Sequence, residues 1–581
     1  MKKILSVVLV MVMLSVSVSA LADWTAGTYT GTAEGKNGPV TVQVAVSGSE
    51  ILSVEVTEHQ ETPGLSDPAI EQIPEAIVSG QTLNVDTVTG ATVTSEAILT
   101  AVTDALVQAG ADVEALKTKE AAGSAAEVAD MTTQVVVVGG GMAGLLASTS
   151  AADAGAEVIL VEKLPYLGGS VAVASGTLLT VESEYTKDVA DEIERPIAYY
   201  HLLNDGMPHQ PDYEFLTAVL EKNGETIDFM TGNLGLEGKV SDANFAKVSF
   251  DGRGAGLVAR LEEAAVKKGV TILKSTKAES IVMENGAAAG VVVSCREGSY
   301  TIHAGKVIIC AGGASHDQER MHKYISQLDT VDLYEKASIG NTGDGFTMLE
   351  AVGADIVQDL FVKASAPEFA EIFGFTVSTK PSIANQLLVD AEGKRFVTEA
   401  PLTAMMLTTD MIYHASPAYY AIYDKVNITD ELKAAFEEQL EKGESRIVVW
   451  AATPEELAEK LGMDPAVFTA TFDAYQEACA AGEDKEFGKS ADHLIAFDTT
   501  EGLYAAYQIP SSYGTIGGCV SDLNGHVLDK EGNVIPNLFA AGETSTFKLF
   551  GDYYVGGGSL GLYATTGRIA GLTAVEELNQ K

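Results

Sequence analysis

Three glycines stand at a spacing that suits the binding of a diphosphate. Gly139, Gly141 and Gly144 follow a run of valines, and Glu162 comes about twenty residues later. Gly139 would permit a tight turn, Gly141 would let backbone N–H groups approach a pyrophosphate, and Gly144 would let a helix pack on a strand. The helix N-terminus would add positive potential, and Glu162 could accept hydrogen bonds from ribose hydroxyls. The pattern predicts a dinucleotide site, with a purely structural glycine turn as the alternative.

The elements that must position these groups can be read around the motif. A continuous β-branched run at 134–138 predicts a strand that is buried on both faces. A helix is expected through Leu145 and Ala152, and residues 157–161 predict a second strand that ends at Glu162. Strand, glycine turn, helix and strand make a βαβ unit, which predicts a Rossmann-type α/β fold.

Further glycine-rich motifs lie downstream. They are Gly168-Gly169-Ser170, residues 307–313, Thr342-Gly343-Asp344-Gly345, residues 393–396, Ala540-Ala541-Gly542-Glu543 and residues 556–560. On these motifs, residues 131–581 resemble the FAD-dependent family of soluble fumarate reductases, urocanate reductase and 3-ketosteroid dehydrogenases, which are flavocytochrome c-like flavoproteins. The resemblance implies noncovalent FAD and a mobile α+β clamp domain inserted in the FAD-binding domain.

The resemblance also implies individual contacts with FAD. Asp344 and Glu543 would contact the cofactor, and Ala278 would lie near the adenine. Ser559 and Leu560 would offer backbone groups to the flavin ring. The residues expected to hold FAD are Gly139, Gly141, Ala143, Gly144, Glu162, Gly168, Gly169, Ser170, Ser175, Gly176, Ala278, Asp344, Gly345, Glu543, Ser559 and Leu560.

The N-terminal block carries two other motifs, His-Gln-Glu-Thr-Pro-Gly-Leu at 59–65 and Asp-Thr-Val-Thr-Gly-Ala-Thr at 86–92. They resemble an FMN-binding domain whose flavin is attached through a phosphoester. The resemblance implies covalent FMN on Thr92, added by a flavin transferase, with Thr94 as the less favoured attachment point. The alternative is a threonine-rich turn in which Thr94 or Ser95 caps a helix.

The pocket expected at the flavin lacks the cations that a dicarboxylate requires. Fumarate reductases hold two carboxylates with arginines and histidines, and guanidinium groups suit that task because they bind in a bidentate way. At the corresponding positions this chain has Ser382, Ala366, Tyr513 and Tyr554. Fumarate reduction is therefore not expected.

The catalytic residues are expected to be Tyr554, Gly558 and Tyr513. Tyr554-Val-Gly-Gly-Gly resembles the ketosteroid dehydrogenase arrangement, in which a tyrosine hydroxyl and a backbone N–H four residues later hold a ketone oxygen. Two such donors would stabilise an enolate, and the phenol could also donate a proton. Packing of the tyrosines on the flavin is the alternative. No metal site is expected.

The first residues predict a secretory signal peptide. Lys2 and Lys3 precede the apolar stretch 4–14, and Ala20-Leu21-Ala22 ends the segment, with cleavage expected near Ala22. No later segment is long and apolar enough to span a bilayer. The expected layout is a signal peptide (1–22), an α+β FMN-binding domain (23–110), a linker (111–130), the first part of the FAD-binding domain (131–359), the clamp domain (360–507) and the second part of the FAD-binding domain (508–581).

Composition excludes several classes of protein. With 37 basic and 81 acidic residues, the formal net charge is −44, which repels nucleic-acid phosphates. The four cysteines are far apart and form no Cys-x-x-Cys pair, which excludes zinc ribbons, attached c-type haem and dense disulfide scaffolds.

The sequence therefore predicts an exported flavoenzyme that reduces a carbon–carbon double bond conjugated to a carbonyl, on an enone, an aryl enoate or a steroid-like substrate. Electrons would pass from an extracytoplasmic or membrane donor to FMN, then to FAD and the substrate, in anaerobic respiration. A ketone-desaturating dehydrogenase of the 3-ketosteroid type is one alternative. A non-catalytic flavin electron-transfer protein is another.

Overall fold

The computed structural model describes residues 24–61, 66–88, 91–119, 128–242, 244–368, 383–443 and 447–580. The chain divides after Ala125 into two compact units. The expected signal peptide, residues 1–22, lies outside the described residues.

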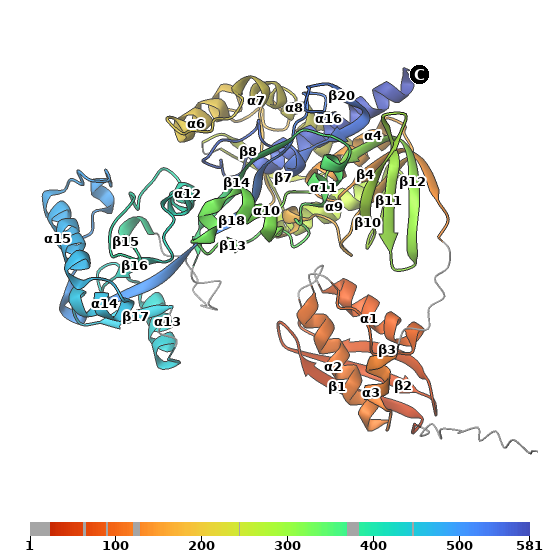
Figure 1. Cartoon of the computed structure of the whole chain (residues 1–581), viewed down its shortest axis with the longest axis horizontal. Coiled ribbons are helices and arrows are strands. Elements are labelled where there is room, and N and C mark those ends of the chain that lie inside the picture. The colour runs from red at the N-terminus through yellow and green to blue at the C-terminus, as the bar shows by residue number, and fades with distance from the viewer. Residues whose placement is uncertain are drawn as a thin grey trace, which may run out of the picture. The chain divides into compact units, whose positions relative to one another are not determined.

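The first unit is a small α+β domain (Figure 1). Its strands β1 (Gly27–Glu34), β2 (Pro39–Val46) and β3 (Ile51–Glu58) form an antiparallel sheet in that order. Helices α1 (Asp67–Gly80) and α2 (Thr92–Gln108) pack on this sheet. The alternating valines of β2 are buried in the core, as the period of two predicts.

A third helix, α3 (Val113–Thr118), belongs to the first unit although the sequence placed it in the linker. The Asp112 side chain caps this helix by accepting a hydrogen bond from the Ala115 N–H at 3.0 Å. Leu116 is buried in the core of the unit, and its carbonyl accepts a hydrogen bond from the Thr82 hydroxyl at 2.9 Å. The domain therefore continues beyond residue 110, the boundary that composition alone suggested.

The second unit is built on an eight-stranded sheet. Strands β12 (Gly298–Ile309), β4 (Met131–Val138), β5 (Val158–Val161) and β9 (Thr271–Leu273) run parallel in that order. Helix α4 (Met142–Asp153) connects β4 to β5, which confirms the predicted βαβ unit. Strand β20 (Val534–Ala540) pairs in parallel with β12.

Helix α16 (Ser559–Asn579) packs closely against α4 (Figure 1). A Cβ atom at Gly567 would stand 2.2 Å from the carbonyl oxygen of Ala143, and one at Gly571 would stand 2.3 Å from that of Ala147. These two positions therefore require glycine. The close packing brings the first residues of both helices to the wall of one cavity, where Met142 and Ser559 face it.

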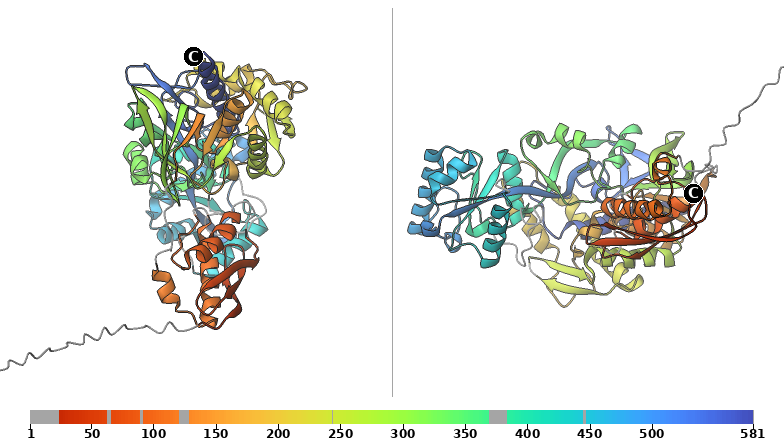
Figure 2. Two further views of the ribbon diagram at one scale, coloured as in Figure 1. Left: turned by 90° about the vertical axis from the view of Figure 1, so that its right-hand side faces the viewer. Right: turned by 90° about the horizontal axis from the view of Figure 1, so that it is seen from below.

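A six-stranded sheet joins strands of the region predicted as the clamp domain to strands outside it. Its longest strand, β18 (Leu503–Cys519), pairs with β16 (Tyr419–Tyr423) and β17 (Val448–Ala451) through its first residues. Its later residues pair with β14 (Ile356–Glu368). Figures 1 and 2 show the helices α13 (Asp430–Glu441), α14 (Pro454–Leu461) and α15 (Pro465–Ala481) at the end of this unit away from the eight-stranded sheet.

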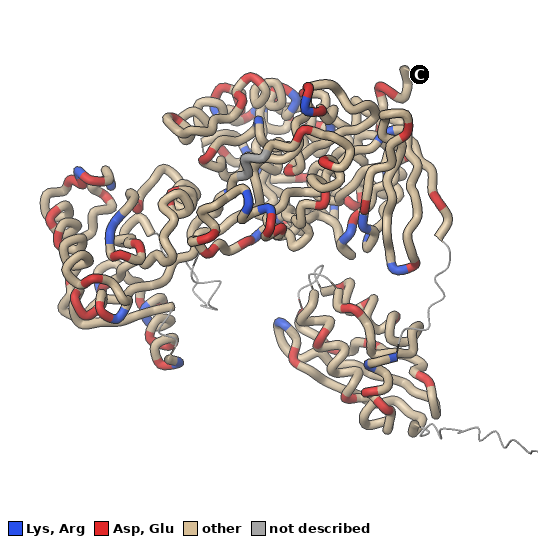
Figure 3. Tube along the Cα trace, viewed as in Figure 1, with Lys and Arg blue, Asp and Glu red and all other residues tan. Residues whose placement is uncertain are grey.

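The remaining elements complete the second unit. The helices are α5 (Ser170–Val173), α6 (Glu194–Asn204), α7 (Tyr213–Leu220), α8 (Asn223–Asp228), α9 (Arg253–Lys267), α10 (Gln318–Tyr324), α11 (Asp344–Ala351) and α12 (Ala404–His414). The strands are β6 (Thr177–Leu179), β7 (Gly238–Asp242), β8 (Ala246–Phe250), β10 (Lys277–Glu284), β11 (Ala287–Cys295), β13 (Tyr334–Glu335), β15 (Leu387–Asp390) and β19 (His526–Leu528). Acidic residues are spread along the chain of both units (Figure 3). Among the described helices, none is long and apolar enough to cross a membrane.

Candidate active site

A cavity of about 810 Å³ opens at the carboxyl ends of the parallel strands of the second unit. Val138 at the end of β4, Val161 at the end of β5 and Cys310 just after β12 line it. Ligands of α/β sheets bind at this edge because the loops that follow the strands converge there. The opposite wall comes from residues 334–341, from β14 and from the start of α16.

The first glycine turn has the geometry that the sequence predicted. Gly139 has a positive φ of 99°, and a Cβ there would stand 2.3 Å from the carbonyl oxygen of Cys310. A Cβ on Gly144 would stand 1.8 Å from the carbonyl oxygen of Gly139, so the helix lies directly on the turn. Gly141 precedes α4, and a Cβ there would stand 3.9 Å from the carbonyl oxygen of Gly168. The free helix N-terminus and the open space at Gly141 fit a diphosphate.

Glu162 lies at the end of β5, in the cavity wall. Its Oε2 accepts a hydrogen bond from the Gly140 N–H and its Oε1 accepts one from the Leu164 N–H, both at 2.8 Å. Burial raises the pKa of this carboxyl, while the two backbone donors oppose that change. Each oxygen keeps a second lone pair for a ribose hydroxyl.

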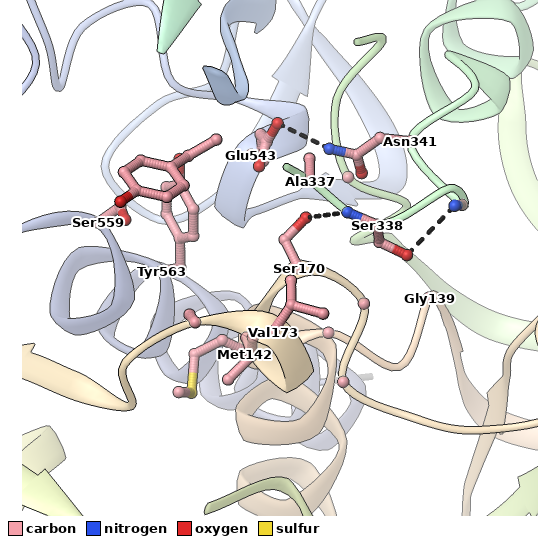
Figure 4. Close-up of a pocket in the computed structure, with 18 of the residues that line it drawn as sticks. Gly139, Met142, Ser170, Val173, Ala337, Ser338, Asn341, Glu543, Ser559 and Tyr563 are labelled. Carbon is pink, nitrogen blue, oxygen red and sulfur yellow. Dashed lines mark hydrogen bonds between the residues drawn. The ribbon is translucent and has the colours of Figure 1, made fainter. Parts of the chain in front are cut away.

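A polar network crosses the middle of the cavity (Figure 4). The Ser338 N–H donates to the Ser170 hydroxyl at 3.1 Å, and the Asn341 side chain donates to Glu543 at 3.0 Å. The other Glu543 oxygen accepts from the Lys363 ammonium at 2.8 Å. Burial disfavours the charged form of Lys363, but the Glu543 charge outweighs it and raises the Lys363 pKa. Lys363 therefore stays protonated and is held as an ion pair within the wall.

Tyr554 and Tyr513 lie together at one end of the cavity. Their ring centroids are 6.4 Å apart, and the Tyr554 hydroxyl is 2.8 Å from the Ser559 hydroxyl. Burial raises the pKa of Tyr554, and the nearby Lys363 ammonium partly opposes this. The phenol of Tyr554 therefore remains protonated at neutral pH.

Gly558 differs from its expected role as a backbone donor to the substrate. Its N–H donates to the carbonyl of Val555 at 3.1 Å, within the turn that starts α16. A Cβ on Gly558 would stand 2.6 Å from the Tyr200 hydroxyl, on the side of the protein core. The helical turn therefore already uses the Gly558 N–H, the group that the resemblance to ketosteroid dehydrogenases assigned to a ketone oxygen.

Lys336 is a cavity residue that the sequence analysis missed. Its ammonium nitrogen lies 3.0 Å from the Ser365 hydroxyl and 5.6 Å from the centre of the Tyr513 ring. Ala366, which stands where the family has a histidine, is also in the wall. Lys336 stands six residues before the Thr-Gly-Asp-Gly motif. This closeness to a motif expected at the cofactor was the sequence signal that could have identified Lys336 as a cavity residue.

Most of the predicted FAD-binding residues line this cavity. They are Gly139, Gly141, Ala143, Glu162, Gly168, Gly169, Ser170, Ser175, Ala278, Asp344, Glu543, Ser559 and Leu560. Gly144, Gly176 and Gly345 lie behind the wall instead. Gly176 packs on the backbone of Arg253, and Gly345 packs on Ala311, so their role is close packing.

The predicted FMN attachment point belongs to the first unit. Thr92 is the first residue of α2 and is exposed. Thr94 is buried, and its hydroxyl donates to the buried carboxylate of Glu61. The Ser95 hydroxyl accepts from the Val88 N–H at 3.0 Å, and no side chain caps α2. Accessibility therefore favours Thr92, whereas residues 62–65 and 89–90 of the two motifs lie outside the described residues.

The fold and the cavity define a flavoprotein, and comparison with known proteins agrees. The chain belongs to the family of the FAD binding domain, whose model matches residues 134–560. The model of the FMN-binding domain matches residues 35–107, so both flavin domains are present. The family resemblance and the fold class that the sequence predicted are confirmed.

Several similar proteins are named for unsaturated acids, and others are named as 3-oxosteroid 1-dehydrogenases. The chain is 29% identical to an NADH:acrylate oxidoreductase of Vibrio harveyi, over 94% of this chain and 61% of that protein. It is also 29% identical to a urocanate reductase of Eggerthella lenta, over 96% of this chain and 94% of that protein. The open structure of a flavocytochrome c3 fumarate reductase matches with a TM-score of 0.59 and 25% identity, over 77% of this chain and 78% of that one. The chain thus spans about three fifths of the Vibrio protein.

Proposed function

We propose that this protein is an exported flavin-dependent oxidoreductase that reduces a carbon–carbon double bond conjugated to a carbonyl group. The observation that carries the proposal is one end of the cavity, where Tyr513, Tyr554 and Lys336 gather beside the start of α16. A wall with two tyrosines, one of them a buried protonated phenol, and a nearby lysine suits an unsaturated carbonyl compound.

The residues of this chain divide into those that hold a cofactor and those that meet the substrate. When bound, FAD would supply a hydride to one carbon of the double bond, and FMN would take electrons from the donor. The neighbouring carbon needs a proton, and the Tyr554 hydroxyl is a neutral donor with the Ser559 hydroxyl as its hydrogen-bond partner. Lys336 would hold the carboxylate or carbonyl oxygen and stabilise the negative charge that develops there.

The replacement of the family's cationic ligands favours a substrate with at most one carboxylate. Lys363 is paired with Glu543, and Lys336 lies beside the Tyr513 ring. Ser382, which replaces the family's arginine, lies outside the described residues. An aryl enoate, an enone or a steroid-like ketone fits this arrangement better than a diacid does, and acrylate and urocanate, named for two relatives, are monocarboxylates.

The attachment of FMN and the site of action complete the proposal. We infer a phosphoester between FMN and Thr92, supported by the exposed hydroxyl at the start of α2 and by the matched FMN-binding domain. The signal-peptide pattern of residues 1–22 supports export. The donor would then be a membrane or extracytoplasmic electron carrier that serves anaerobic respiration.

The reverse reaction, desaturation of a ketone, is the second candidate. The Tyr554-Val-Gly-Gly-Gly sequence and the neutral phenol favour it, because the same groups stabilise the enolate in either direction. Turnover with reduced viologen compared with turnover with an oxidised dye distinguishes the two directions.

The test is a panel of oxidants added to the reduced holoprotein: acrylate, cinnamate, urocanate, a cyclic enone, a steroid enone and fumarate. We expect one of the monocarboxylates or enones to reoxidise it faster than fumarate does. Lys336→Met should raise the KM of a carboxylate acceptor about tenfold and leave that of a neutral enone unchanged. Faster turnover of fumarate would refute the proposed specificity, and a panel without any oxidant would favour an electron-transfer protein.

A further inference from the structure

Two hydrogen bonds join the clamp helix α12 to the loop that carries Tyr554. The Tyr553 hydroxyl donates to Asp410 Oδ1 at 2.5 Å, and the Tyr413 hydroxyl donates to Asp552 Oδ1 at 2.7 Å. Asp410 and Tyr413 are three residues apart on α12, so they share one face of the helix. Each side of the contact therefore supplies one phenol and one carboxylate.

The same loop is also held from the other side. The His209 ring Nδ1 lies 2.9 Å from Asp552 Oδ1, and the His209 N–H donates to Asp552 Oδ2 at 3.1 Å. The buried Asn204 accepts from the Tyr553 N–H at 3.0 Å and donates to the Tyr553 carbonyl at 3.3 Å. Residues 552–553 are thus fixed between the end of α6 and the clamp helix.

Incomplete packing at this junction makes the polar contacts important. A second cavity of about 180 Å³ lies beside them, lined by His209, Phe361, Thr409, Tyr413 and Asp552 among others. Where an apolar interface leaves a void, its side chains lose contacts and hold the two parts together less firmly. Directional hydrogen bonds to carboxylates then define how α12 sits on the loop.

The loop transmits its position directly to the cavity. Tyr554 follows Tyr553 in the chain, and its hydroxyl meets Ser559. A Cβ on Gly556 would stand 2.6 Å from the end of Met405, which lies at the other end of α12 and also lines the cavity. Helix α12 therefore touches the loop before and after Tyr554.

We propose that the Tyr553–Asp410 and Tyr413–Asp552 pairs form a crossed latch that fastens the clamp to the 551–558 loop and holds Tyr554 in its working position. Asp410, Tyr413, Asp552 and Tyr553 are thus positioning residues, which act through Tyr554. Loss of the Tyr553 hydroxyl removes the donor to Asp410, and loss of the Tyr413 hydroxyl leaves Asp552 bound to His209 alone, so the attachment of α12 depends on both bonds. This inference goes beyond the proposed function, because the latch exists whatever the substrate is.

The experiment is hydrogen–deuterium exchange on the full-length, FAD-loaded protein without substrate, followed in peptides that cover 404–414 and 547–558. In Tyr413→Phe/Tyr553→Phe we expect exchange in both segments to become about tenfold faster or more. The matched control is Tyr504→Phe, which removes a tyrosine–carboxylate bond to Glu437 inside the clamp, and it should exchange as the wild type does in both segments.

A conservative rescue separates positioning from general loss of stability. Asp410→Asn keeps an oxygen that accepts from Tyr553 and should retain most of the protection, whereas Asp410→Ala should behave as Tyr553→Phe does. The single variant Tyr413→Phe, whose ring is 43% exposed, gives a folded comparison if the double variant does not bind FAD. Wild-type exchange of 547–558 in FAD-loaded Tyr413→Phe or Tyr553→Phe would overturn the latch.

Discussion

Tyr554 combines the properties that a proton donor to carbon needs. It is buried, its hydroxyl has a hydroxyl partner in Ser559, and its raised pKa keeps it protonated. Tyr513, by contrast, is partly exposed at the cavity mouth, so it suits contact with the substrate rather than proton storage.

Tyr554→Phe should lower turnover roughly 10²-fold while FAD remains bound, because the ring still fills its place and only the proton is lost. The measurement is steady-state reduction of the best acceptor from the panel, with FAD content checked by absorbance. Tyr563→Phe is the control, since its hydroxyl contacts Lys363 at 3.5 Å and is not expected to supply the proton. Turnover equal to that of the wild type would assign Tyr554 to packing.

Many of the residues expected at the site from local sequence lie in the wall of one cavity, but other wall residues were not expected. Glu162 was predicted from its distance to a glycine turn, and it lies in the cavity wall. Lys336 and Lys363 were not predicted, because β13 and β14 reach the cavity through pairing with β18, far along the chain. No periodicity in the sequence reports the register of such distant strands.

At the scale of elements, α12 is the part whose attachment depends on pH. Burial raises the Asp410 pKa to about 6, although the hydrogen bond from Tyr553 acts in the opposite direction. If release of the helix returns Asp410 to water, its pKa falls toward the ordinary value for aspartate. The latched state therefore binds a proton more tightly than the released state.

The sign of this linkage predicts tighter latching in acid. The stabilisation of the latched state by the Asp410 proton is complete below the Asp410 pKa of the released state. It is lost as the pH rises through about 6, the Asp410 pKa of the latched state. We expect release, measured as exchange of 547–558 corrected for intrinsic chemistry, to be roughly tenfold more frequent at pH 8 than at pH 5.

The variant Asp410→Asn separates the effect of Asp410 from that of the other titratable groups at the junction. Tyr553 and Tyr413 have pKa values raised mainly by burial, so they do not titrate in this range, while His209 faces Asp552. Asp410→Asn keeps all three and should remove the pH dependence. A dependence that persists in this variant would assign it to His209 and Asp552.

Helix boundaries at this scale were only partly predictable. The apolar spacing from Ala97 to Leu106 is typical of a helix face, and the apolar residues Ala97, Ile98, Ala101, Val102, Ala105 and Leu106 of α2 are buried in the core of the first unit. Helix α3 lies in the segment that the sequence assigned to a possibly helical linker, because six residues with one buried leucine carry too little periodicity to mark a helix of the domain.

At the scale of the whole molecule, the two units carry separate flavin domains. The FMN-binding domain match ends at residue 107 and the FAD binding domain match begins at 134. The hydrophobic core of the first unit contains no residue from the second among those described. We therefore expect each unit to keep its own cofactor when the other is altered.

Thr92→Ala should abolish the covalent FMN adduct and leave about one FAD per chain, because the substitution lies on the exposed start of α2. Intact-mass spectrometry of protein produced with its flavin transferase detects the adduct, and acid-released flavin reports FAD. Thr94→Ala is the comparison, and it should retain the adduct. An adduct that survives Thr92→Ala would mean that another residue is the attachment point.

Strand β18 changes its pairing partners along its length and also carries Tyr513. Its residues 503–508 pair with β16 and β17, its residues 509–519 pair with β14, and Tyr513 lies within this second part of the same unbroken strand. A rotation of the β16–β17 part relative to β14 would therefore bend β18 close to Tyr513, so that movement of these strands and reorientation of this ring would be coupled.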